Sequence, residues 1–134
     1  RRSSDLWVQE GVIDYLGHTD TIEEFLELAD LVVLPSYREG TPRILLEAAA
    51  MAKPIVTTDV PGCREVVQHE VNGLLVQARN VEALAQAMER LILDPELRQQ
   101  YGLRGRELAM EFCENAVIAA TESVYRKARN KNGL

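Results

Sequence analysis

Two glutamates, Glu39 and Glu47, are the side chains best suited to chemistry in this sequence. Glu47 stands alone in the otherwise apolar run of residues 44–51, where a bare carboxylate would be costly to bury and needs a partner. A vicinal diol such as a ribose offers two hydroxyl donors to one carboxylate, and Glu39 can reach the hydroxyls of a second sugar. The alternative is an ion pair between Glu47 and Arg43, four positions earlier on the same helix, with Glu39 as a solvated loop residue.

The residues between the two glutamates have the character of an anion site. Ligands of parallel α/β sheets bind beyond the carboxyl ends of the strands, and the loop at residues 35–40 leaves such an end. Gly40 allows a ligand close to the main chain. Thr41 supplies a capping hydroxyl and Pro42 suits the first helical position. The free amides that follow begin a helix whose positive end can hold phosphate oxygens.

Strands and helices alternate around this loop. Apolar runs predict strands at residues 12–16, 31–34, 54–58 and 74–76. Between them we expect a helix that Asp20 caps and that continues through Ala29, a helix at residues 43–51 and a short helix at residues 64–68. Further helices are predicted at residues 81–93, 95–112 and 115–127. This order indicates one α/β domain over residues 1–134, with a doubly wound, Rossmann-like parallel sheet flanked by helices and extra C-terminal helices.

Composition excludes several classes of partner. The chain has 134 residues, a net charge of -6 and 46% hydrophobic residues, which fits one globular domain without nonspecific attraction to nucleic acid. Cys63 and Cys113 lack metal-ligand spacing and suit a reducing cytoplasm. No run approaches the roughly 18 apolar residues of a membrane span. We therefore expect a soluble, cytoplasmic protein without metal or cofactor.

A longer motif carries a family resemblance. The residues PSYREGTPRILLEA at 35–48, followed by KPIVTTDVPG at 53–62, resemble glycosyltransferase family 4. The signature of that family is two glutamates separated by seven residues, then a strand and a glycine turn, and Glu39 and Glu47 have this spacing. The resemblance extends from about Val12 through the strand at residues 74–76 and loosely into the terminal helices. It implies the C-terminal, donor-binding half of a GT-B fold.

The resemblance also implies roles for single residues. The family's glutamate at the position of Glu47 binds the nucleotide ribose, and its glutamate at the position of Glu39 contacts the donor sugar near the reacting carbon. Main-chain groups from Gly40 through Thr41 and Pro42 to Arg43 face the sugar and the diphosphate. Such enzymes transfer a hexose from a nucleotide diphosphate sugar with retention of configuration and without a divalent metal, here to a polysaccharide or glycolipid acceptor.

The sequence departs from the family pattern in two residues and lacks two parts of the family's machinery. The family usually has glycine at the position of Ala52, and many members have glycine at that of Pro42. Its diphosphate-binding Arg and Lys come from an upstream strand-helix unit that has no counterpart here, and the acceptor domain is also absent. We therefore expect no turnover by this chain alone, and we expect exposed sheet edges that could support oligomers.

Weaker signals complete the set of candidates. Ser36 and Arg64 lie in turns at the same sheet edge and are candidate cleft residues, although Arg64 could equally form a surface ion pair with a nearby acid. His18 and His69 lack a nucleophile or metal spacing and are interpreted as structural or exposed. The basic residues near the C-terminus suit either the last turns of a helix or attraction to a membrane surface; they are Arg126, Lys127, Arg129 and Lys131.

Other functions also fit the sequence. The chain could be a regulatory module that keeps a nucleotide-sugar site without catalysis, or a purely structural domain that binds no nucleotide. Epimerases and phosphorylases share the GT-B frame and are more distant alternatives. Titration with UDP, GDP and ADP sugars separates the binding hypotheses from the structural one.

Overall fold

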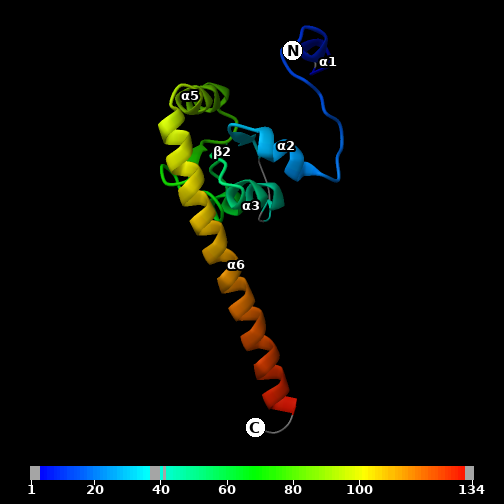
Figure 1. The fold of residues 1–134 in the computed structure, drawn as a ribbon, viewed down its shortest axis with the longest axis vertical. Coiled ribbons are helices and arrows are strands. Elements are labelled where there is room, and N and C mark those ends of the chain that lie inside the picture. The colour runs from blue at the N-terminus through cyan, green and yellow to red at the C-terminus, as the bar shows by residue number, and fades with distance from the viewer. Residues whose placement is uncertain (1–3, 37–39, 41, 132–134) are drawn as a thin grey trace.

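A computed structural model describes residues 4–36, 40 and 42–131. Three short strands form its centre, and helices surround them (Figure 1). In chain order the elements are α1 (Ser4–Gln9), α2 (Ile22–Leu28), β1 (Val32–Leu34), α3 (Arg43–Ala50), β2 (Ile55–Thr58), α4 (Pro61–Arg64), β3 (Gly73–Val76), α5 (Val81–Ile92) and α6 (Pro95–Lys131).

The sheet is parallel and has the order β1-β2-β3. Val33 of β1 pairs with Val56 of β2, which pairs with Leu74 of β3. All four residues of β2 are buried, as expected for the central strand of a parallel sheet with helices on both sides. The carboxyl ends of the three strands consequently meet at one edge, where the loop after β1 begins.

Two hydrophobic clusters cover the two faces of the sheet. Neighbouring residues of β2 divide between them, because side chains alternate along a strand: Ile55 belongs to a cluster with α2 and α3, and Val56 to a cluster with α5 and the start of α6. The predicted doubly wound α/β arrangement is therefore confirmed. Buried Leu45 fixes α3 on one face and buried Leu91 fixes α5 on the other.

The outer edge of β3 is partly covered from within the chain. His69 forms a parallel bridge with Gly73, and its ring Nδ1 accepts a hydrogen bond from the Leu75 N–H at 3.0 Å. The main-chain N–H of Glu70 donates a hydrogen bond to the Gly73 carbonyl. The Glu70 carboxylate forms an ion pair with Arg90, and this contact lowers the pKa of Glu70. These contacts cover part of the outer edge of β3, and the structural interpretation of His69 is supported.

The predicted strand at residues 12–16 is wrong. This stretch has no regular structure, and all five of its residues are exposed, four of them large hydrophobic ones. A strand requires a neighbour to pair with, and nothing in the described part of the chain pairs with it. In Figure 1 this stretch runs from α1 to α2 outside the body of the molecule.

Three helix boundaries also differ from the prediction. Thr21, rather than Asp20, is the residue before α2, and its N–H donates to the hydroxyl of Thr19. The short helix α4 begins at Pro61 instead of Arg64, since proline suits the first helical turn. The predicted helices at 95–112 and 115–127 form one helix, α6. No glycine or proline lies between Arg106 and Lys131 to interrupt it.

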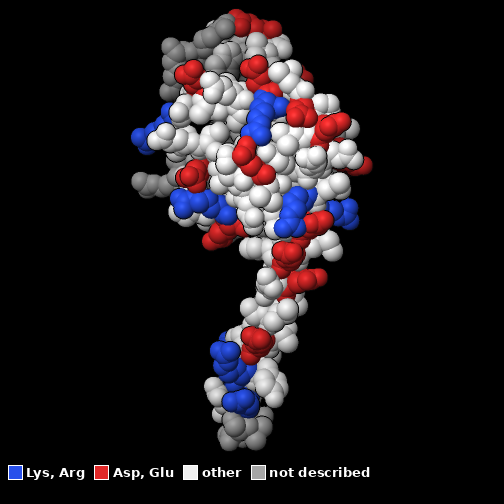
Figure 2. Space-filling view, turned by 90° about the vertical axis from the view of Figure 1, so that its left-hand side faces the viewer, with Lys and Arg blue, Asp and Glu red and all other residues white. Residues whose placement is uncertain are grey.

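The second half of α6 projects away from the body (Figure 1). Its residues from Met110 to Lys131 are exposed. On the face shown in Figure 2, acidic and basic side chains are interspersed over the body, and basic side chains are prominent towards the far end of the projecting helix. The basic residues that the sequence places near the C-terminus therefore lie at the tip of α6; they are Arg126, Lys127, Arg129 and Lys131.

Candidate functional site

The carboxyl edge of the sheet has a small hollow lined by residues that follow or end each strand. Pro35 comes after β1, Thr58 ends β2, Val76 ends β3 and Gln77 follows it. The hollow has a volume of about 70 Å³ and continues to Arg79 and the start of α5. Arg79 has a positive φ of 64°, and its position at this edge was not foreseen from the sequence.

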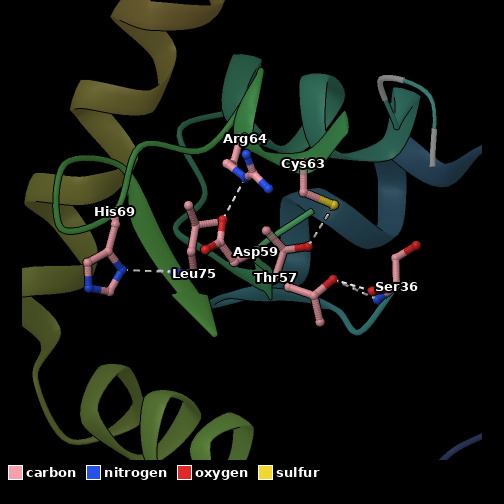
Figure 3. A network of polar contacts seen from close by, with 8 residues as sticks. Ser36, Thr57, Asp59, Cys63, Arg64, His69 and Leu75 are labelled. Carbon is pink, nitrogen blue, oxygen red and sulfur yellow. Dashed lines mark hydrogen bonds and ion pairs between the residues drawn. The ribbon is translucent and has the colours of Figure 1, made fainter. Parts of the chain in front are cut away.

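The chain leaves β1 through Ser36, which is buried and held by β2. The Ser36 N–H donates to the Thr58 Oγ1 at 3.2 Å, and the Thr58 hydroxyl donates to the Ser36 carbonyl. Figure 3 shows these two contacts side by side. Ser36 was predicted to line a cleft; the structure gives its main chain an anchoring role at the start of the loop.

The predicted loop is described only at its ends and at Gly40. Glu39 and Thr41 lie outside the described residues. Gly40 is exposed, and a Cβ placed on it would meet no atom of the described residues within 4 Å.

Pro42 is the N-cap of α3, not its first helical residue. Its ψ of 119° is extended, and its carbonyl accepts from the N–H groups of Leu45 and Leu46. No side chain of the described residues caps this helix. The Leu45 N–H is the first amide of this helix to donate to the Pro42 carbonyl. The amides of Arg43 and Ile44 come before it, in the first turn, where main-chain N–H groups can bind an anion.

Glu47 is paired within α3. Its Oε1 lies 3.1 Å from the Nε of Arg43, and the Glu47 side chain retains 25% of its exposure while Arg43 retains 91%. We expected a buried Glu47 carboxylate that needs a partner. In the structure the carboxylate is half-buried, and its partner Arg43 is exposed. Such a pair contributes little to stability, so hydroxyl groups of a ligand can replace Arg43 at small cost.

The next strand-helix turn is closed by its own residues. Arg64 Nε lies 2.7 Å from Asp59 Oδ1, with both side chains about half exposed. Thr57 donates from Oγ1 to the Leu34 carbonyl at 2.7 Å and contacts the buried thiol of Cys63 at 3.3 Å. Figure 3 shows the Arg64–Asp59 and Thr57–Cys63 contacts, which link α4 to β2 and to the residue that follows it. The surface pair foreseen as the alternative for Arg64 is present.

Other features lie away from this edge. A larger groove of about 170 Å³ lies between α3, the segment after α4 and α6, and no predicted site residue lines it. Among the described residues, no three His, Cys, Asp or Glu side chains gather into a metal-binding group. No described helix combines the length and apolar character needed to cross a bilayer.

Comparison with known proteins finds one family model and several relatives that match this chain. The family model "Glycosyl transferases group 1" matches residues 6–108. A relative from Campylobacter jejuni, N,N'-diacetylbacillosaminyl-diphospho-undecaprenol alpha-1,3-N-acetylgalactosaminyltransferase, is 34% identical over 119 residues, covering 89% of this chain and 32% of the relative. The chain thus spans about a third of the length of this curated relative.

Solved structures agree in fold. Sucrose-phosphate synthase from Thermosynechococcus elongatus superimposes with a TM-score of 0.82 at 29% identity, over 92% of this chain and 33% of that one. HepE of Anabaena, solved in complex with UDP, gives a TM-score of 0.78 at 26% identity, over 90% of this chain and 35% of that one. Because the family model covers well over half of the sequence and these folds coincide, the chain belongs to the glycosyl transferases group 1 family and forms the C-terminal half of a GT-B fold.

Proposed function

We propose that this chain is the donor-binding half of a retaining glycosyltransferase that transfers a hexose from a nucleotide diphosphate sugar. The observation that carries the proposal is the start of α3 at the carboxyl edge of the sheet, four residues before the half-buried Glu47. Family membership supports transfer from a nucleotide sugar. HepE, solved in complex with UDP and with UDP-glucose, supports this class of donor.

Each proposed contact follows from the chemistry of the helix start. The diphosphate would accept hydrogen bonds from the amides of Arg43 and Ile44, at the positive end of α3. Glu47 would exchange its exposed partner Arg43 for the two ribose hydroxyls. Glu39, from the sequence motif, would contact the donor sugar near the reacting carbon. The proposal needs no metal, because main-chain amides and the helix dipole supply the positive potential.

The acceptor is proposed to be a polysaccharide or a lipid-linked sugar. The name of the Campylobacter jejuni relative includes a diphospho-undecaprenol, which is a lipid-linked carrier. The basic tip of α6 would suit peripheral attraction to an anionic membrane surface. Since the chain spans about a third of that relative, we expect donor binding without turnover by this chain alone.

Calorimetric titration with UDP-glucose, GDP-mannose and ADP-glucose tests the proposal. One of them should bind, and Glu47→Ala should weaken that binding about tenfold or more, since a charged hydrogen-bond acceptor is lost. Glu89→Ala is the matched control, because Glu89 is an exposed glutamate within another helix, α5. The absence of binding across the panel, or equal binding by wild type and Glu47→Ala, would contradict the proposal.

A further inference from the structure

The second half of α6 is a long helix with no covered face. All residues from Met110 to Lys131 are exposed, and this projecting segment, residues 110–131, is about 33 Å long, since an α-helix rises about 1.5 Å per residue. Figure 1 shows it extending away from the other elements. An isolated helix of this length is only marginally stable in water, and most protein helices are stabilised by packing of an apolar face.

The projecting segment has one apolar side. The residues of this apolar stripe follow one another in steps of three or four positions, so they lie on one side of the helix, as in helices that pair along a seam. They are Met110, Cys113, Val117, Ala120, Val124 and Ala128. Met110, Val117 and Val124 retain between 57% and 68% of their exposure. The opposite side carries polar residues, which are Glu111, Asn115, Glu122, Arg126 and Arg129.

The charges of the projecting segment are separated along its length. Residues 110–121 contain two glutamates and no lysine or arginine, whereas residues 122–131 contain four basic residues and one glutamate. Basic side chains accordingly gather towards the tip in Figure 2. Packed helices lie about 8–10 Å apart, which is about one Debye length at physiological salt. A parallel pair of such segments would bring two basic ends together, while an antiparallel pair brings each basic end beside an acidic one.

We propose that the projecting segment pairs with the same segment of a second copy of this chain, in antiparallel order along the apolar stripe. The two copies are then related by a two-fold axis that passes near Ala120. Val117 of one protomer lies opposite the partner's Val124, and the small side chain of Ala120 allows the two main chains to approach closely. The two bodies stay apart, because they lie at opposite ends of the pair.

A lipid surface is the other partner that an amphipathic helix can take. Glu111 and Glu114 in the first half of the segment and the net charge of -6 disfavour insertion of the stripe into an anionic membrane. Arg126 and Arg129 lie on the polar side and remain exposed in the pair, so attraction of the basic tip to a membrane is compatible with pairing. The pairing uses no residue of the candidate site and is independent of the proposed function.

Sedimentation equilibrium of the whole chain tests the pairing. A short interface between two helices is expected to have a Kd of about 10 μM, so the chain should be mostly dimeric at about 100 μM and mostly monomeric at about 1 μM. Val117→Glu places a charge in the seam and should raise the Kd about tenfold or more. Because Val117 is exposed, this variant should keep the fold of the monomer.

Asn115→Glu is the matched control. It adds the same side chain to the same part of the helix, on the polar side, and Asn115 is also exposed. The Kd of the dimer should change by less than about threefold. Equal effects of Asn115→Glu and Val117→Glu would overturn the assignment of the interface to the stripe.

Cysteine cross-linking tests the orientation. In an antiparallel pair the two Cys113 residues lie about 20 Å apart along the helix axis, which is too far for a disulfide. The double variant Cys113→Ser with Ala120→Cys instead places two thiols beside the two-fold axis. With diamide as the oxidant, this variant should form a cross-linked dimer and the wild type should not. The buried Cys63 is common to both proteins.

The remaining outcomes decide against the proposal. A monomer at every concentration up to about 100 μM, or equal dimerisation of Val117→Glu and wild type, would overturn the pairing. Cross-linking through Cys113 in the wild type as fast as in the Ala120→Cys variant would show a parallel pair. A monomer that binds vesicles of phosphatidylglycerol and phosphatidylcholine, and loses that binding in Val117→Glu, would assign the stripe to lipid instead of a second copy.

Discussion

The two ends of α3 are built in opposite ways. At the C-terminal end, the Lys53 N–H donates to the Ala48 carbonyl and the Ala52 N–H to the Ala49 carbonyl, a Schellman closure that satisfies the last carbonyls. At the N-terminal end, the described residues provide no side-chain cap, and Glu47 forms an ion pair with the exposed Arg43. One end is completed by the protein itself, and the other is left open to solvent.

The difference shows how a short helix can serve structure and binding at once. The closed end packs against α6, where Gly102 lies against the main chain of Ala52. The open end keeps its first amides and a half-buried carboxylate beside the sheet edge. Substitutions at the closed end should change stability without altering ligand affinity, and those at the open end should do the reverse.

The largest effect is expected from Gly102→Ala. A Cβ on Gly102 would lie 2.1 Å from the Ala52 carbonyl oxygen, and main-chain atoms cannot rotate away as a side chain can. We expect a loss of about 3 kcal/mol in the free energy of unfolding, measured by urea denaturation. Alanine normally favours a helix over glycine, so a loss of this size can only come from the contact between α6 and α3.

Gly105→Ala is the control on the same helix. Its Cβ would come no closer than 3.3 Å to the side chain of Asn72, so a small adjustment is sufficient and helix propensity offsets it in part. The unfolding free energy should change by less than about 1 kcal/mol. Equal losses for the two variants would contradict the special role of the Gly102 contact.

A smaller effect of opposite sign is expected at Ala52. Its φ of 59° is left-handed, a conformation that costs a non-glycine residue about 1–2 kcal/mol. Glycine removes that strain but adds entropy to the unfolded chain. Ala52→Gly should therefore stabilise the protein by about 0.5–1 kcal/mol. Unchanged urea denaturation would show that the turn accommodates alanine without strain.

This position also explains one departure in the sequence. Ala52 stands where the resembled family usually has glycine, and the sequence alone gave no reason for that preference. The reason is the backbone of the helix end, because a Schellman closure places its C′ residue in the left-handed region. The presence of alanine instead of glycine at position 52 therefore affects the stability of the C-terminal end of α3 and removes no group from the candidate site.

The strands and most helices could be predicted because their signals are local. The apolar run at residues 31–34 carries its information within a few residues. The same holds for the starts of α5 and α6, where Asn80 and Asp94 accept hydrogen bonds from the N–H groups of Ala83 and Leu97. Residues 12–16 have an equally apolar pattern but form no strand, since pairing depends on a neighbour that no local pattern reveals.

The candidate site divides in the same way. The spacing of Glu39 and Glu47 can be recognised from the sequence, and so can the start of a helix next to Pro42, although the exact role of Pro42 was predicted one position off. The contact between Ser36 and Thr58 is not, because it joins residues 22 positions apart through the register of two strands. The pairing of Arg43 with Glu47 was foreseen as an alternative, but its weak, exposed character became clear only from the geometry.

The smallest effect on stability is expected from Arg43→Ala, and it decides between two interpretations of Glu47. If Glu47 serves only as the partner of Arg43, both variants of the pair should behave alike. If Glu47 serves a ribose, Arg43→Ala should change the free energy of unfolding by less than about 0.5 kcal/mol, because Arg43 is exposed. Its amide, which is proposed to face the diphosphate, is retained in alanine, so nucleotide-sugar affinity should stay within about twofold.

Calorimetry of Arg43→Ala beside Glu47→Ala therefore measures whether the carboxylate or the ion pair matters. A large loss of affinity for Glu47→Ala with none for Arg43→Ala places the binding role on the carboxylate alone. A slight gain for Arg43→Ala would go further, because it would show that the ligand must displace the guanidinium to reach Glu47. Equal losses of affinity in the two variants would instead show that the Arg43–Glu47 ion pair has a structural role. Ligand binding at the N-terminal end of α3 would then depend on the main-chain amides of the helix.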